Sequence, residues 1–264
     1  MFETIDLDGG RRLAFVHRPG KTPGVLFCGG FKSDMTGTKA LALEQFFVDE
    51  GRAFTRFDYT GHGASSGDFE DGTIGAWADD VVAIIDNVTE GPLILVGSSM
   101  GGWIMVLAAL ARPERVKGLV GIASGPDFTE DLIWARGSEA QQAELMAKGR
   151  WVEPSAYSDQ PYVITRKLIE DGRKHLVLRA PIPFVGPVHL LHGQRDPDVP
   201  WQTSLRLAGA LQSEDVTVEL IKSGDHRLSK PHEIARICTA TQRVVALLDE
   251  TQRVSASLDG AAAD

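Results

Sequence analysis

A serine between two glycines, in Gly97-Ser98-Ser99-Met100-Gly101, is the stretch of this chain best suited to chemistry. A four-residue apolar run, 93–96, precedes it, and a helical pattern over 100–111 follows. This strand–turn–helix context is typical of a nucleophile elbow, which exposes its central serine at a strained turn. Free N–H groups at the start of the helix favour the oxyanion that develops in acyl transfer. Ser99 is therefore the expected nucleophile. Ser98, off-centre in the motif, is the alternative, and a glycine-rich turn without chemistry is the competing explanation.

A serine hydroxyl is a poor nucleophile until a base takes its proton. Among the seven histidines, His226 is the best placed, because its polar loop, 222–227, directly follows the last predicted strand. The loop after the preceding predicted strand holds two carboxylates, and we expect Asp196 to be the acid that orients the imidazole. Asp198 is the alternative acid, or a residue that orients this loop. The order Ser99, Asp196, His226 is the chain order of the elbow-type hydrolases.

Two more histidines follow predicted strands. His62 lies in the loop rich in turn formers, 58–67, and is expected to support the site without touching the reacting atoms. His192 precedes Gly193 at a strand end and is expected to order that turn.

The oxyanion of an acyl-transfer intermediate needs two N–H donors. One is expected from Met100, directly after the nucleophile, and the other from the loop after the third predicted strand. That loop begins Gly29-Gly30, which lets the backbone approach an acyl group closely. Phe31 is the expected second donor, and Lys32 is the alternative.

These residues must be held by alternating strands and helices. Apolar runs predict strands at 2–7, 12–17, 24–28, 53–57, 93–96, 116–122, 186–192 and 216–221. Helical periodicity predicts helices at 38–50, 74–88, 100–111, 202–209 and 230–249. The alternation predicts an α/β fold with a mostly parallel, eight-stranded sheet and helices on both faces.

The alternation breaks at residues 124–180, which we call the cap segment. It is polar, has helical patterns at 128–136, 138–148 and 164–174, and carries the aromatic residues Trp134, Trp151, Tyr157 and Tyr162. We expect a small helical cap insertion over the carboxyl edge of the sheet, with an apolar acyl pocket beneath it. An ordinary helical connection is the alternative. The expected core is then 1–123 with 181–254, and 255–264 is an expected flexible tail.

Composition narrows the function classes. The net charge of −9 argues against nucleic-acid binding and against docking on an anionic membrane. Cys28 and Cys238 are expected to be buried thiols, and no Cys/His spacing predicts a metal site. The chain shows neither a signal-peptide pattern nor an apolar run long enough to span a bilayer, so the expected location is the cytoplasm.

At this point the chain resembles the α/β-hydrolase family over nearly its whole length. Four stretches, 30–40, 57–63, 97–103 and 154–165, resemble one branch, the abhydrolase-domain enzymes that include a mitochondrial mycophenolic acid acyl-glucuronide esterase and palmitoyl-protein thioesterase. The resemblance implies the triad Ser99, Asp196 and His226, and hydrolysis of small acyl esters or thioesters without a cofactor. A proline follows the expected acid in Asp196-Pro197-Asp198, which departs from the family pattern.

Three function classes remain open. The expected one is a serine esterase or thioesterase that works through an acyl-enzyme. The same triad also serves carbon–carbon bond hydrolases and perhydrolases, and a ligand receptor on this fold can keep an intact triad. A serine at the elbow centre argues against haloalkane dehalogenases and many epoxide hydrolases, which use aspartate there. The sequence leaves the substrate and the oligomeric state open.

Overall fold

The structure is a computed structural model that describes residues 1–153 and 162–261. Its centre is an eight-stranded sheet in the order β1-β2-β4-β3-β5-β6-β9-β10. β1 pairs with β2, and β2 with β4, in antiparallel fashion, whereas all the other neighbours in this sheet pair in parallel. The strands span Glu3–Leu7 (β1), Arg11–Arg18 (β2), Lys21–Cys28 (β3), Arg52–Phe57 (β4), Leu93–Ser98 (β5), Val116–Ile122 (β6), Val188–Gly193 (β9) and Val216–Ile221 (β10). The expected mostly parallel α/β fold is confirmed.

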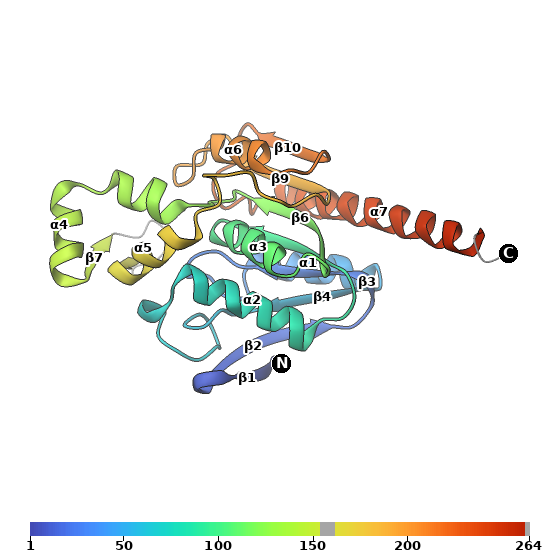
Figure 1. Cartoon of the computed structure of the whole chain (residues 1–264), viewed down its shortest axis with the longest axis horizontal. Coiled ribbons are helices and arrows are strands. Elements are labelled where there is room, and N and C mark those ends of the chain that lie inside the picture. The colour runs from blue at the N-terminus through green and yellow to red at the C-terminus, as the bar shows by residue number, and fades with distance from the viewer. Residues whose placement is uncertain (154–161, 262–264) are drawn as a thin grey trace.

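Helices cover both faces of this sheet (Figure 1). Alternate side chains of β5 enter different cores, Leu93 and Leu95 on one face and Ile94 and Val96 on the other. This is the period-two pattern of a strand that is buried on both sides. The first core is completed by α2 (Ile74–Val88), α3 (Met100–Ala111) and α6 (Gln202–Ala210), and the second by α1 (Thr38–Asp49) and α7 (Pro231–Ala261).

The cap segment contains helices and one short hairpin. Its elements are a π-helix, η3 (Thr129–Trp134), followed by α4 (Glu139–Lys148), β7 (Arg150–Glu153), β8 (Tyr162–Thr165) and α5 (Arg166–Gly172). The antiparallel β7–β8 pair was not predicted, and the helix expected from 164 begins at Arg166. Strands of four residues carry too short an alternation to stand out against flanking helical patterns. The expected aromatic Tyr157 lies outside the described residues.

Helix α7 is longer than expected. It continues to Ala261 instead of ending at 249, and Figure 1 shows it extending well past the sheet. Neither proline nor glycine occurs between 250 and 259, so the sequence there offers no helix stop. Helix therefore covers most of the range 255–264, where a flexible tail is expected from the sequence, and the flexibility of that tail stays a prediction.

Two expectations from composition can be compared with the structure. Cys28 and Cys238 are both buried free thiols, as predicted. Burial raises the pKa of the Cys28 thiol to about 12, which keeps it protonated and unreactive at neutral pH. Within the described part of the chain, no helix combines the length and the apolar character needed to cross a membrane.

Candidate active site

Ser99 stands at a sharp turn between β5 and α3. Its φ of 55° lies in the left-handed region, which is unusual for a residue with a side chain. The turn needs glycines on both sides, because a Cβ on Gly97 would lie 2.3 Å from the Gly101 oxygen, and one on Gly101 would lie 2.1 Å from the Cys28 oxygen. The strand, the turn and the start of the helix are thus packed against β3. The expected elbow geometry is present at the expected residues.

Two side chains from distant loops complete a line of hydrogen bonds. The His226 Nε2 atom lies 2.9 Å from Ser99 Oγ, and its Nδ1 atom lies 2.7 Å from Asp196 Oδ2. Since a carboxylate can only accept, Nδ1 carries the hydrogen, and Nε2 is left to accept the Ser99 hydroxyl proton. The structure therefore brings together the three residues expected to form the triad, and it aligns His226 with Ser99.

Asp196 is held as an ion. Its side chain is fully buried, and Oδ1 accepts the backbone N–H groups of Asp198 and Val199 at 2.8 and 2.9 Å. Burial alone would raise the pKa of Asp196, but hydrogen bonds from His192 and His226 outweigh it and hold this pKa well below the usual range. A permanently charged carboxylate at this position stabilises an imidazolium on His226.

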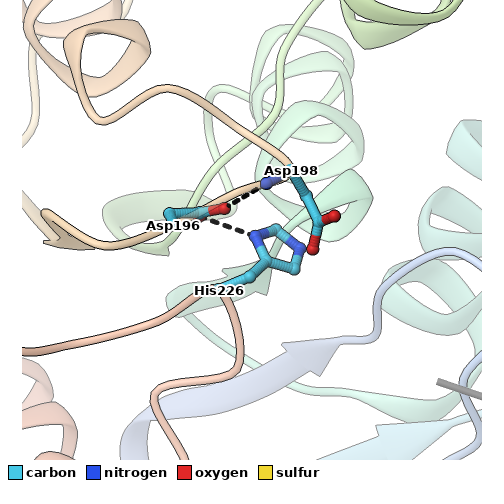
Figure 2. Close-up of side chains that lie close together, drawn as sticks. All are labelled: Asp196, Asp198 and His226. Atoms are coloured by element: carbon cyan, nitrogen blue, oxygen red, sulfur yellow. Dashed lines mark hydrogen bonds and ion pairs between the residues drawn. The ribbon is translucent and has the colours of Figure 1, made fainter. Parts of the chain in front are cut away.

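Asp198 occupies a different position from Asp196 despite its nearness in sequence. Figure 2 shows the Asp196 carboxylate joined to the His226 ring and to the Asp198 backbone nitrogen, whereas the Asp198 carboxylate lies beside the His226 ring. Asp196 thus bonds the His226 ring directly, and the Asp198 amide bonds the Asp196 carboxylate.

Asp196, Asp198 and His226 are the one group, among the described residues, whose His and carboxylate atoms could meet at a metal ion. Their ligand atoms lie within 4.8 Å of one another. Both ring nitrogens of His226 already have partners, Asp196 at Nδ1 and Ser99 at Nε2, so a metal bound to this ring would have to displace one of these hydrogen bonds. The donor set therefore fits proton handling better than metal binding.

The loop after β3 lies against the elbow. A Cβ on Gly30 would approach the Ser98 oxygen and the Ser99 Cβ at 3.4 and 3.5 Å, so this loop runs beside the nucleophile. The Lys32 N–H donates to His62 Nε2 at 3.2 Å, and Lys32 has a φ of 59°. Met100 is the first residue of α3, where an amide has no partner within the helix.

His62 supports the loop after β3 through its hydrogen bond with Lys32. It is almost fully buried, its Nδ1–H donates to the Thr60 oxygen at 3.3 Å, and its ring packs edge-on to Trp77. Burial lowers the pKa of His62 to about 4, which keeps its Nε2 atom free to accept from Lys32. The expected supporting position of His62 agrees with this contact.

A cavity of about 620 Å³ opens above Ser99. One part is apolar and combines Phe31 of the core with cap-segment residues, namely Phe128, Leu132, Ile133, Trp151, Tyr162 and Ile164. The other part is polar and lies beside His226; it includes Lys39, Arg227 and Ser229. The site therefore has room for an apolar chain on the side of the cap segment and for a polar group on the other.

Sequence reasoning placed His192 only as a turn residue. In the structure its Nε2 atom lies 3.1 Å from Asp196 Oδ2, the oxygen that also bonds His226. The i, i+4 spacing of His192 and Asp196 across a strand end was the one available signal, but the sequence does not show that the chain folds back there.

Comparisons with known proteins agree with this geometry. Residues 25–237 match the model of the alpha/beta hydrolase family. The mouse protein named palmitoyl-protein thioesterase ABHD10, mitochondrial, is 47% identical over 229 residues, which cover 86% of this chain and 77% of that protein.

Two solved structures are similar over nearly their whole length. The mouse alpha/beta hydrolase domain-containing protein 10 superposes with a TM-score of 0.87 at 40% identity, covering 94% of this chain and 99% of that one. A putative hydrolase from Agrobacterium vitis S4 superposes with a TM-score of 0.88 at 41% identity, covering 93% and 99%. With the elbow, the loops and the sheet described above, these matches show that the chain belongs to the alpha/beta hydrolase family.

Proposed function

We propose that this protein is a serine hydrolase that cleaves acyl esters or thioesters, with Ser99, His226 and Asp196 as its catalytic triad. The observation that carries the proposal is the continuous hydrogen-bonded line from Ser99 through His226 to the buried Asp196. The name of the mouse relative, a palmitoyl-protein thioesterase, favours thioesters with a long apolar acyl chain.

The proposed reaction follows from this geometry. Ser99 Oγ attacks the acyl carbonyl while His226 Nε2 takes the Ser99 proton. Asp196 stabilises the imidazolium that forms on His226. The imidazolium then protonates the leaving thiol or alcohol, which departs and leaves an acyl-enzyme. Water, activated by the same imidazole, releases the carboxylic acid and restores Ser99.

For the oxyanion hole we propose the backbone N–H groups of Phe31 and Met100. The alternative donor, the Lys32 N–H, is already bound to His62. Phe31 belongs to the loop that runs beside Ser99, and Met100 presents its N–H at the start of α3. These two amides would hold the negative oxygen without any metal or cofactor.

The cavity supports an assignment of its two parts. The apolar part under the cap segment would take the acyl chain, and the polar part beside His226 would take the leaving group. The described parts of the cap segment, 124–153 and 162–180, would then cover the acyl chain. A cytoplasmic location stays a prediction, and the mouse relative is named as mitochondrial.

Active-site labelling tests the proposal directly. A fluorophosphonate probe should modify the folded protein once, and peptide mass spectrometry should find the adduct on Ser99. The protein should also hydrolyse S-acyl thioesters of 2 to about 16 carbons, a range that tests the apolar cavity. A folded protein that neither reacts at Ser99 nor turns over any acyl ester or thioester would contradict the proposal, and turnover of β-diketones alone would favour carbon–carbon bond hydrolysis.

A further inference from the structure

The Asp196 carboxylate is bonded by a second imidazole. His192, near the end of β9, has a fully buried side chain. Its Nε2 atom lies 3.1 Å from Asp196 Oδ2 and 3.0 Å from the Val199 oxygen, and its Nδ1 atom lies 2.7 Å from Ser204 Oγ. The proposed triad thus continues through Asp196 to a histidine and a serine that no step of the reaction above uses.

The partners of His192 fix which of its nitrogens carries the hydrogen. The Val199 carbonyl and the ionised Asp196 can only accept, so Nε2 is the donor and shares its hydrogen between them. In the neutral ring, Nδ1 then accepts the hydroxyl hydrogen of Ser204, a buried residue of α6. This hydroxyl draws electron density from the ring and makes Nε2–H a stronger donor.

Asp196 Oδ2 consequently serves two imidazoles at once. It accepts from His226 at 2.7 Å and from His192 at 3.1 Å, while Oδ1 accepts two backbone amides. Each added donor disperses the negative charge of the carboxylate and weakens its attraction for a proton on His226. A carboxylate shared between two imidazoles attracts a proton on either ring less strongly than a carboxylate that serves one ring alone.

We propose that His192 is a positioning residue for the hydrolysis proposed above: it fixes Asp196 Oδ2 against His226 and takes up part of its charge, so that His226 remains a base in mildly acidic solution. The inference rests on the proposed function. Among the described residues, the charged side chains around His226 and Asp196 include Asp198, Lys39 and Arg227, and Arg136 donates to the Asp198 carbonyl. Asp225 and Glu233 lie close enough to Lys39 to interact with its charge.

The test is the pH dependence of kcat/KM for a thioester, measured with His192→Phe. Phenylalanine keeps the ring volume and removes both nitrogens. We expect the acid limb of the profile to move to higher pH by about half a pH unit to one pH unit. Without the His192 donor, the negative charge of Asp196 is less dispersed and attracts a proton on His226 more strongly. At pH 6 kcat/KM should fall by up to about tenfold, whereas the alkaline plateau and KM should change little.

Two further variants separate this effect from general damage. His192→Gln restores an N–H donor and should bring the acid limb back toward its original position. His189→Phe replaces a buried imidazole of the same strand that faces Glu219 instead of Asp196, and it should leave the limb in place. Circular dichroism and thermal melting confirm folding of each variant.

An unmoved limb, or one shifted to lower pH, in folded His192→Phe would overturn the inference. If that variant fails to fold, Ser204→Ala gives the same test with a smaller upward shift, and no shift there would overturn it as well. The proposed function fails separately: in that case the wild-type protein would show no thioester turnover and no labelling of Ser99.

Discussion

The edge of the sheet that carries Ser99 and the cap segment that covers it are built in different ways. At the sheet edge the reactive side chains lie in the turn and loops that follow β5, β9 and β10, and part-buried hydrogen bonds hold them together. The cap segment has a small core of its own around Leu145 and Trp151, but its outer side chains are open, with Val152 56% exposed.

This difference in construction assigns the reaction to the sheet edge and the choice of substrate to the cap segment. Groups that must meet within a few tenths of an ångström lie in the turn and short loops that follow strands of the core, and these strands fix their positions. Groups that only need to offer apolar surface lie on a segment with short helices and a four-residue hairpin. Changes at the sheet edge should therefore alter the rate, and changes in the cap segment should alter the choice of substrate.

The largest effect is expected at Ser99. Ser99→Ala removes the nucleophile and should lower kcat by about four orders of magnitude or more, with KM little changed. Steady-state thioester hydrolysis measures this loss, and thermal melting should show a fold as stable as that of the wild type. Ser98→Ala is the matched control at the neighbouring residue; if it abolished labelling while Ser99→Ala did not, Ser98 would be the nucleophile.

The next largest effect distinguishes the two aspartates of one loop. Asp196→Asn removes the charge that supports the His226 imidazolium and should reduce kcat by about a thousandfold to ten-thousandfold. Asp198→Asn keeps the backbone N–H that bonds Asp196 and should cost less than about threefold. Equal losses in the two variants would mean that both carboxylates act on His226.

The free energy of unfolding should depend on pH through His62, which lies behind the loop at the sheet edge. Its pKa of about 4 in the folded protein lies below the value of 6.5 for an unperturbed histidine, so the unfolded chain binds the proton more tightly. The contribution of His62 to stability is therefore complete above pH 6.5 and is lost as the pH falls toward 4, by about 3 kcal/mol in total.

Urea unfolding at several values of pH between 4 and 8 measures this change. His62→Phe keeps an aromatic ring among Phe69 and Trp77 but cannot titrate, so it should flatten the profile by about that amount. A variant profile as steep as that of the wild type would assign the pH dependence to other groups.

The smallest effect is expected in the cap segment. Trp151→Ala enlarges the apolar part of the cavity and should raise KM for long-chain thioesters by about tenfold, while acetyl thioesters keep their kcat/KM. Val152→Ala, at the adjacent outward-facing position, should change neither value. A fall in kcat for acetyl thioesters with Trp151→Ala would show that the cap segment also shapes the reacting geometry.

The sequence predicted the sheet edge better than the cap segment. The sheet, the elbow and the loops that carry His226 and Asp196 were readable, because glycine spacing and apolar runs are local signals. The β7–β8 pair was missed because each strand has four residues, and its pairing joins segments that no local pattern connects.

The contact of His192 with Asp196 was missed for a related reason. His192 belongs to a strand, where an inward imidazole looks like any other core residue. Its role depends on a turn that brings Asp196 back over the strand end, and on a helix that supplies Ser204. Such three-way meetings are fixed by tertiary packing rather than by spacing.

Phe31 joins the two regions in a single residue. Its ring contacts Phe69 and Trp77 from the core, Phe128 at the cavity and Tyr162 of β8 in the cap segment, while its backbone N–H is the proposed oxyanion donor. Anyone who wishes to redesign chain-length preference should accordingly start at Trp151 or Ile164 and leave Phe31 intact. A smaller side chain at Phe31 would leave its backbone N–H less firmly positioned. Such a variant would accept a broader range of substrates but would turn all of them over more slowly.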